Sequence, residues 1–286
     1  MSSPPISAAL KNLVLCADDF ALSKPVSKAI VQLAQAQRIS ATSAMVLSPH
    51  WVEDAASLKE LRGQIDVGLH LDWTSEFALA RGHGLSLGCA MLRSVLPSRW
   101  GGLNAHTVEA EIEHQLDAFE SSWQAPPDHI DGHQHIQQFG TLRRALLRVM
   151  ARRYPGRQPY LRVSRPPTGQ ADLKGRVMAA WGSQALTCEA ARMHIPCAPA
   201  LSGIYNLFDD SLDYAALMAA WLAQVPESTL VMCHPGLPAD PGAGPTGDHA
   251  YARVAEWRHL SSDLFVQQLQ QHGVLLARGA RLYPSP

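Results

Sequence analysis

Short apolar runs that end in acidic residues or histidines recur along the chain, and segments with a helical pattern separate them. The first run, at residues 13–17, ends directly in Asp18 and Asp19. A continuous apolar run of this length predicts a buried strand that leads into a loop. Strands that alternate with helices predict βα units and a parallel sheet. With 286 residues, the chain is long enough for one large α/β domain.

The other expected elements follow the same alternation. Further strands are expected at residues 41–47, 65–71, 129–136, 159–163, 186–194, 229–233 and 274–277, and helices at residues 23–37, 55–61, 107–123, 141–154 and 265–272. Residues 75–104 interrupt the alternation. They are rich in glycine but keep apolar residues, which favours an insertion or lid over a linker. Residues 1–11 are expected to be a flexible N-terminus, and residues 235–250 a mobile loop.

Composition excludes several classes of protein. A formal net charge of -1 gives no electrostatic basis for binding nucleic acid or an anionic membrane. No apolar run approaches the length of a membrane-spanning helix, and the first residues lack the pattern of a signal peptide. The five cysteines are odd in number and form no Cys-x-x-Cys, which favours reduced thiols. We therefore expect a cytoplasmic protein.

Four clusters of polar residues lie at or near the carboxyl ends of predicted strands. They are Asp18-Asp19, Gly68-Leu69-His70, the segment from His129 to His135, and Cys233-His234-Pro235. In a parallel α/β barrel these strand ends face one rim, where catalytic sites are built. The four clusters are therefore expected to meet.

The histidine-rich segment is the most unusual of the four. As a strand, it would place His129, Asp131, His133 and His135 on one face. Burying these groups without partners would be costly, and a metal ion held by neutral imidazoles removes that cost. An exposed edge strand with solvated histidines is the alternative.

The other clusters have ordinary structural explanations when each is taken alone. Aspartates such as Asp18 and Asp19 often cap turns, and His70 or His234 alone would more often be structural. Together, one aspartate and two histidines suit a divalent metal that activates water. The sequence has no Gly-x-Ser-x-Gly, phosphate loop or dinucleotide motif. A metal-dependent hydrolase is the favoured interpretation.

At these residues the chain resembles the YdjC-like carbohydrate deacetylases, the ChbG/HpnK family. The matching motifs, in the family's order, are Ala17-Asp18-Asp19-Phe20, Gly68-Leu69-His70-Leu71 with Thr74, His129-x-Asp131-x-His133-x-His135 and Val231-Met232-Cys233-His234-Pro235. Weaker likenesses are Leu161-Arg162 and Arg253-x-x-Glu256.

This resemblance implies an irregular, TIM-barrel-like (β/α) barrel, with residues 1–286 as a single domain. It implies an enzyme that removes acetyl groups from N-acetylated sugars with one divalent metal ion. By motif position the metal ligands are Asp19, His70 and His133, the general base is Asp18, the general acid is His234, and Arg162 steadies the catalytic carboxylate.

The metal and the assembly stay open at this point. Two imidazoles favour zinc or another transition ion, whereas family members are often described with magnesium. Family members are also often dimers, so a homodimer is one expectation.

Other residues near the motifs have two interpretations each. Asp131 either orients a ligand histidine or makes a structural hydrogen bond, and His135 is a candidate substrate contact. Trp73 either stacks on a sugar ring or packs in the core, and Trp100 is a second stacking candidate. Ala21 stands where the family usually has glycine. A positive φ there would cost about 1 kcal/mol.

Two alternative functions remain. One is a different metal-dependent hydrolase, such as an amidohydrolase or phosphoesterase. The other is a metal- or sugar-binding protein without turnover, although such a protein would need neither Asp18 nor His234. The substrate could be a chitin-derived disaccharide, another amino sugar or a glycolipid headgroup, and the insertion at residues 75–104 is expected to decide among them.

Overall fold

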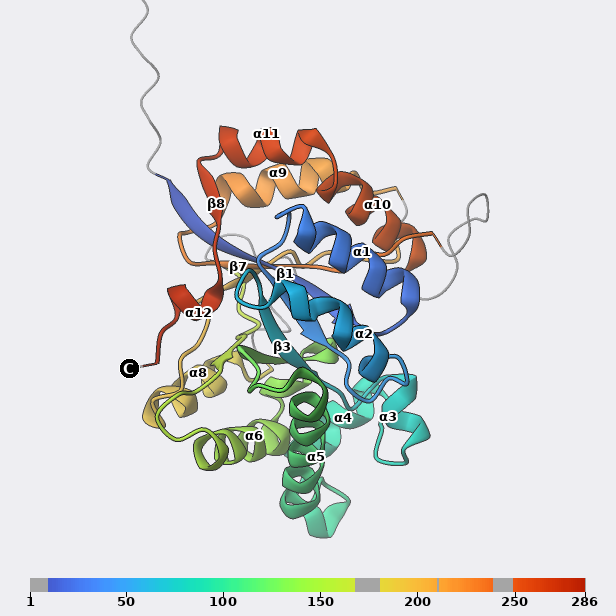
Figure 1. Cartoon of the computed structure of the whole chain (residues 1–286). Helices are drawn as coiled ribbons and strands as arrows, with labels where there is room; N and C mark the ends of the chain where they lie inside the picture. Colours follow the sequence, from blue (N-terminus) through green and yellow to red (C-terminus); the bar gives the residue numbers. More distant parts are fainter. Residues whose placement is uncertain (1–9, 168–180, 210, 239–248, 286) are drawn as a thin grey trace, which may run out of the picture.

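A parallel β-sheet forms the centre of the computed structural model, which describes residues 10–167, 181–209, 211–238 and 249–285 (Figure 1). Its strands are β1 (Lys11–Phe20), β2 (Ala41–Ala44), β3 (Asp66–Leu71), β4 (His129–Gly132), β5 (Tyr160–Leu161), β6 (Leu201–Ser202), β7 (Leu230–Cys233) and β8 (Val274–Leu276).

The strands are ordered β5-β4-β3-β2-β1-β7-β6, and β8 also pairs with β1. The two outer strands approach each other, because a bridge joins Leu161 in β5 to Cys197 just before β6. The backbone N–H of Leu201 also donates to the carbonyl of Arg165 (2.8 Å). The sheet therefore curls into an irregular (β/α) barrel, which confirms the predicted fold class.

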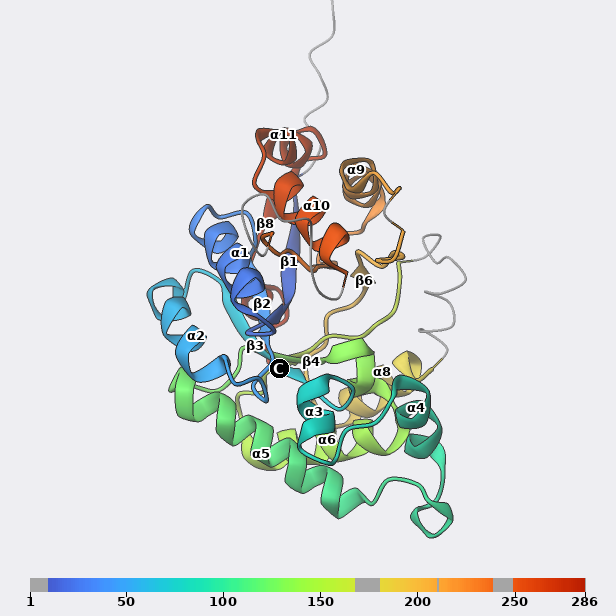
Figure 2. The same ribbon diagram turned by 90° about the vertical axis from the view of Figure 1, so that its right-hand side faces the viewer.

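Helices surround this sheet. They are α1 (Lys24–Gln35), α2 (Trp51–Leu58), α3 (Glu76–Ala80), α4 (Leu87–Val95), α5 (Ala105–Trp123), α6 (Gly140–Arg153), α8 (Ser183–Arg192), α9 (Tyr214–Gln224), α10 (Ala250–Leu260), α11 (Asp263–Gln271) and α12 (Gly279–Leu282), with short 3-10 turns η1 (Lys59–Leu61), η2 (Ser98–Trp100) and η3 (His133–Gln138). Helices α9, α10 and α11 gather at one end of the molecule and α5 and α6 at the other (Figures 1 and 2). None of the helices in the described ranges has the length and apolar character needed to cross a membrane.

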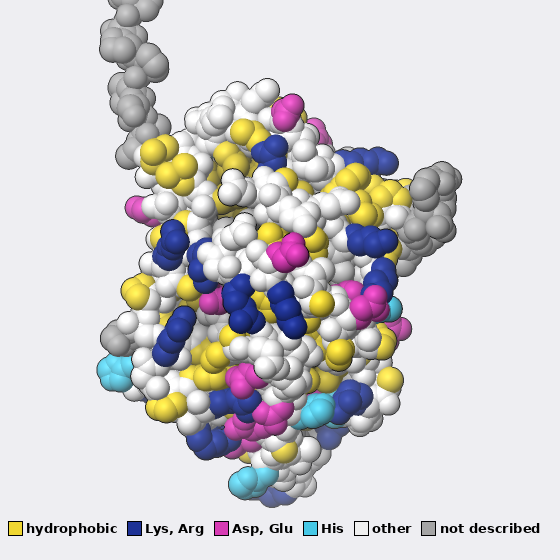
Figure 3. Space-filling view, in the orientation of Figure 1, with side chains coloured by type: hydrophobic (Ala, Val, Ile, Leu, Met, Phe, Trp, Pro, Cys, Tyr) yellow, Lys and Arg dark blue, Asp and Glu magenta, His cyan; other side chains and the backbone are white. Residues whose placement is uncertain are grey.

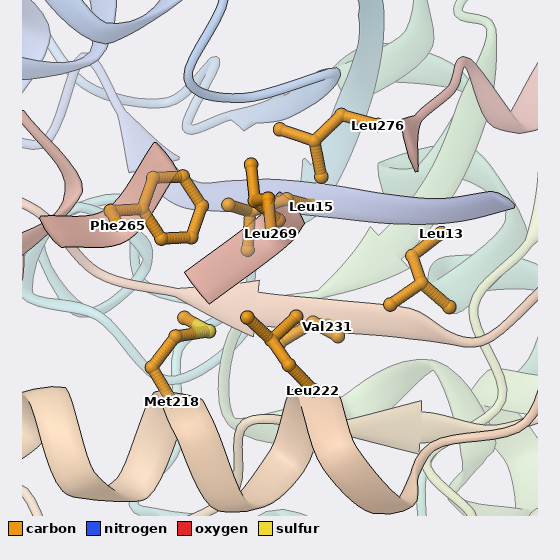
Figure 4. Close-up of a pocket in the computed structure, with 8 residues that line it drawn as sticks. All are labelled: Leu13, Leu15, Met218, Leu222, Val231, Phe265, Leu269 and Leu276. Atoms are coloured by element: carbon orange, nitrogen blue, oxygen red, sulfur yellow. The ribbon is translucent and has the colours of Figure 1, made fainter. Parts of the chain in front are cut away.

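The core lies on both sides of β1, in which every residue from Leu13 to Phe20 is buried. Apolar side chains from β1, β7, β8, α9 and α11 converge on a small pocket (Figure 4). Its lining residues are Leu13, Leu15, Met218, Leu222, Val231, Phe265, Leu269 and Leu276. Because all of these side chains are apolar, the pocket belongs to the packing of the core and offers no group for chemistry.

At the opposite end, ion pairs join α5 to α6. Arg153, for example, contacts Glu113, Asp117 and Glu120 at 2.7–2.8 Å. The lower part of the face in Figure 3 shows acidic and basic side chains next to one another. Exposed pairs of this kind contribute little individually.

Two of the predicted strands are wrong. The expected strand at 129–136 stops at Gly132, because its pairing with β3 ends there. The chain then turns through η3, where Gln134 and His135 adopt left-handed φ of 53° and 62°. His133 and His135 therefore do not share a strand face with His129. The expected strand at 186–194 is helix α8, whose buried residues Leu186 and Ala190 are four apart and lie on one side.

The remaining segments agree with the predictions in part. The expected insertion at 75–104 contains α3, α4 and η2. Most of the expected mobile loop at 235–250 and of the flexible N-terminus at 1–11 lies outside the described residues. No helix or strand was predicted for the segments that form α10 and β6.

Candidate metal centre and active site

Polar side chains from five strands meet at the carboxyl edge of the barrel. Asp18 and Asp19 belong to the end of β1, and His70 to the end of β3. Asp131 lies near the end of β4, and His133 follows directly after that strand. Arg162 and His234 are the first residues after β5 and β7. Parallel pairing brings these strand ends to one rim, as expected.

Asp19, His70 and His133 form a compact set of metal-ligand atoms. One atom from each side chain lies within 4.8 Å of the other two. The Oδ1 atom of Asp19 is 3.2 Å from Nδ1 of His133 and 3.4 Å from Nε2 of His70. One carboxylate and two imidazoles are a donor set that zinc and related divalent ions accept. The residues therefore fit a single divalent ion.

Asp131 fixes the orientation of one of these imidazoles. Its Oδ1 atom lies 2.6 Å from Nδ1 of His70, with which it shares the Nδ1 proton. Nε2 then faces Oδ1 of Asp19, and in the neutral imidazole its lone pair would be open to a metal ion, as in metal sites where a carboxylate orients a histidine ligand. Burial alone would lower the pKa of His70, but the nearby carboxylates of Asp131, Asp19 and Asp18 raise it to about 10. The surroundings thus favour positive charge at this point.

Asp19 is held by a second group outside the ligand set. The Nη2 atom of Arg253 donates to its Oδ2 atom at 2.6 Å. Burial would raise the pKa of Asp19, but Arg253 and the two histidines outweigh it and hold that pKa well below its usual range. Asp19 also has a left-handed backbone, with φ of 67°. Oδ1 thus remains directed at the two histidines.

Asp18 lies against a buried arginine, as the resemblance implies. The Nη1 atom of Arg162 is 2.6 Å and 2.7 Å from the two carboxylate oxygens. It is also 3.1 Å from Oδ2 of Asp131. Both Asp18 and Arg162 are almost completely buried. One guanidinium therefore links the two carboxylates that stand behind the ligand set.

His234 faces Asp18 from the end of β7, the strand that pairs with β1. Its Nε2 atom lies 3.7 Å from Oδ2 of Asp18. Burial lowers the pKa of His234 to about 4, although Asp18 and Asp19 act in the opposite direction. The imidazole is therefore neutral at neutral pH and has one nitrogen directed at Asp18.

With this geometry in view, the chain can be compared with known proteins. The model of the family described as YdjC-like protein matches residues 12–271. The chain belongs to the YdjC-like family. Chitooligosaccharide deacetylases of Proteus mirabilis (strain HI4320) and Enterobacter sp. (strain 638) are 30% and 34% identical to it over 134 residues. Each match covers 44% of this chain and 50% of the relative, so the chain matches about half the length of these curated relatives.

A solved structure also shares the fold. The crystal structure of a proposed cellobiose-phosphate cleavage protein from Enterococcus faecalis V583 superposes with a TM-score of 0.67. The match covers 96% of this chain and 100% of that one at 21% identity. At this identity the likeness concerns the fold alone.

The three residues expected to contact the sugar, His135, Trp73 and Trp100, differ in how exposed they are. His135 lies at the rim, where its Nδ1 atom is 2.8 Å from the hydroxyl of Ser164. Trp73 is buried in the hydrophobic core, with its ring against that of His83. Of the two interpretations of Trp73, packing in the core is therefore the correct one, and its ring is not open to a sugar in this structure. Trp100 is exposed beneath the guanidinium of Arg99.

Two further residues, for which no role was expected, reach the site from α10. Arg253 contacts Asp19, and the carboxylate of Glu256 accepts the backbone N–H of His234. Their only sequence signal was the spacing Arg253-x-x-Glu256, which places both on one side of a helix. Ala21 has a φ of 71°, so the strain expected at this position is present.

Proposed function

We propose that the protein is a metal-dependent hydrolase that removes acetyl groups from N-acetylated amino sugars. The observation that carries this proposal is the meeting of three kinds of group at one rim. These are the ligand set of Asp19, His70 and His133, the arginine-bound carboxylate of Asp18, and His234. Membership of the YdjC-like family supports the proposal. The names of the curated relatives support an acetylated chitooligosaccharide as the substrate class.

Asp19, His70 and His133 would hold one divalent ion. When bound, it would supply Lewis-acid chemistry that acidifies water and polarises the acetyl carbonyl group. Two imidazoles favour zinc and a carboxylate also admits magnesium, so both ions belong in the first assays. Asp131 keeps the Nδ1 proton of His70 in place and thereby presents Nε2.

Asp18 is the general base of the proposal. Its carboxylate takes a proton from the attacking water as the new carbon–oxygen bond forms. Arg162 contacts both carboxylate oxygens through Nη1, and so limits the rotation of the group. A fixed base within reach of the water raises the fraction of encounters that react.

His234 is the general acid, and its protonation follows from its position. With a pKa of about 4, it begins the cycle neutral at neutral pH. The proton that Asp18 takes from water therefore passes across the 3.7 Å separation to Nε2 of His234. His234 then gives it to the sugar nitrogen as the carbon–nitrogen bond breaks, so that one water and one amide yield acetate and an amine. His135, with Nδ1 occupied by Ser164, is proposed to contact the sugar through Nε2.

Acetate release from N-acetylated chitooligosaccharides tests this proposal, with protein reconstituted in turn with zinc and magnesium. We expect release that requires metal and that falls about 100-fold or more in Asp18→Asn, because that variant removes the general base. Asp117→Asn, which neutralises an exposed carboxylate on α5, is the matched control and should retain activity.

The opposite result would favour the other readings of the site. No acetate release by a protein that binds one metal ion per chain would contradict the proposal. Hydrolysis of phosphate esters or cyclic amides by the same preparation would then identify a different hydrolase, and sugar binding without turnover would identify a binding protein.

A further inference from the structure

Helix α10 contacts the site at two of its strand ends. Arg253 donates from Nη2 to Oδ2 of Asp19 at 2.6 Å, and Glu256 accepts the backbone N–H of His234 at 2.5 Å. The two residues are three positions apart and so lie on the same side of the helix. One helix therefore reaches both a proposed metal ligand and the proposed general acid.

The carboxylate of Glu256 has both of its oxygens occupied. Oε2 accepts the N–H of His234, and Oε1 accepts the hydroxyl of Tyr205 at 2.5 Å. The side chain has no exposed surface. A carboxylate in such a place is costly unless donors satisfy it. Burial raises the pKa of Glu256 to about 7, while the bonds from Tyr205 and His234 act to lower it.

The backbone of His234 depends on this contact, because the β-ladder has already ended. The pairing of β7 with β1 stops at Cys233, and Pro235, which follows His234, has no N–H to donate. The N–H of His234 is thus the first donor beyond the strand, and Glu256 supplies its acceptor. Two residues later, the N–H of Gly236 donates to the carbonyl of Arg253 at 3.0 Å. Helix α10 therefore holds the chain at His234 and again just beyond it.

We propose that Glu256 is a positioning residue, which fixes His234 through its backbone N–H so that the imidazole faces Asp18. The inference rests on the proposed function, in which His234 moves the proton. Glu256 lies outside the proposed proton path, because its oxygens contact the hydroxyl of Tyr205 and the backbone N–H of His234, and among the bonds of the described residues neither contacts the imidazole of His234. A displacement of about 1 Å at a catalytic group lowers a rate about 100-fold, so the loss of this contact should be visible in kcat.

Two substitutions separate positioning from proton transfer. Glu256→Ala deletes the acceptor, and we expect kcat for acetate release to fall about 100-fold, with KM and metal content close to those of the wild type. Glu256→Gln keeps one oxygen for the N–H of His234, and its amide can donate to the oxygen of Tyr205. Glu256→Gln should therefore recover most of the lost kcat, and it also provides a folded variant if Glu256→Ala does not fold.

Glu120→Ala is the matched control. Glu120, on α5, accepts a tyrosine hydroxyl at 2.5 Å from Tyr154, as Glu256 does from Tyr205, but it has no contact with His234 among the bonds of the described residues. It should lower stability and leave kcat within about twofold of the wild type. A Glu256→Gln variant as inactive as Glu256→Ala would overturn the proposal in favour of proton transfer by Glu256. A folded Glu256→Ala variant with wild-type kcat would overturn it as well.

The positioning role of Glu256 can be tested even if the deacetylase proposal fails, because it has a readout that does not depend on activity. A wild-type protein that releases no acetate would refute the deacetylase proposal. The contact itself is then decided by the amide proton of His234 in NMR spectra. A downfield, exchange-protected proton that is lost in Glu256→Ala supports positioning by Glu256, and an amide resonance that is unchanged in the variant overturns it.

Discussion

At the scale of single residues, the side chains packed next to the proposed ligand set leave no spare room. His129 lies under Asp131, has no exposed surface, and stacks on Tyr160 with ring centroids 5.0 Å apart. A Cβ atom added to Gly68 would lie 2.4 Å from the imidazole ring of His129. Glycine at position 68 therefore leaves the room that His129 occupies.

Gly68→Ala is expected to lower the free energy of unfolding by about 2 kcal/mol or more, because His129 is packed on all sides and cannot move away without strain. Urea unfolding measures the effect. Gly88→Ala is the matched control, since an added Cβ at Gly88 in α4 meets nothing within 4 Å, and alanine favours a helix by up to about 1 kcal/mol. Equal unfolding midpoints for the wild type and Gly68→Ala would contradict this account.

At the scale of elements, the segment between β8 and α12 closes the end of the barrel opposite the site. Arg278 donates from Nε to Oδ1 of the buried Asp66 at 2.6 Å and from Nη1 to the carbonyl of Gly63 at 3.0 Å. The hydroxyl of Tyr160 donates to the other oxygen of Asp66 at 3.2 Å. Asp66 begins β3, the strand that carries His70 near its other end. The C-terminal segment thus secures a strand that carries a proposed metal ligand.

Removing Arg278 would leave a buried carboxylate without its cation. We expect Arg278→Ala to lower the free energy of unfolding by about 3 kcal/mol, the range for breaking a buried ion pair on one side. Arg148→Ala, which breaks an exposed pair with Glu109 between α5 and α6, should cost less than about 1 kcal/mol. Chemical denaturation of both variants tests the contrast, and similar losses for the two would refute it.

At the scale of the whole molecule, the proposed ion would connect β1, β3 and the turn after β4, which are far apart in the sequence. A ligand that binds only the folded state stabilises it by mass action, by about 2.7 kcal/mol at a hundredfold excess over its Kd. Metal binding should therefore appear as a change in global stability as well as in activity.

Addition of zinc or magnesium to metal-free protein is expected to raise Tm by several degrees. His133→Ala should abolish most of this rise, because it removes one of the three proposed ligands. His106→Ala, which replaces an exposed histidine on α5, should keep it. Differential scanning calorimetry with and without metal decides the question. The same rise in His133→Ala as in the wild type would place the metal elsewhere.

Local patterns in the sequence were enough to predict the alternation of strands and helices, a parallel sheet and the clustering of Asp18, Asp19, His70 and His234, and the family resemblance added the irregular barrel. Short apolar runs define strands by themselves, and parallel strands carry the residues at their carboxyl ends to one rim. The strand expected at 129–136 failed because the point at which a ladder ends depends on the partner strand, here β3.

Contacts between distant residues were decided only by the tertiary structure. Three features leave no periodic trace in the sequence. They are the left-handed turn directly after His133, the approach of Arg253 to Asp19 across 234 positions, and the bond from the backbone N–H of His234 to Glu256. Periodicity records which side of an element is buried. The partner that each polar atom meets there depends on how the elements pack.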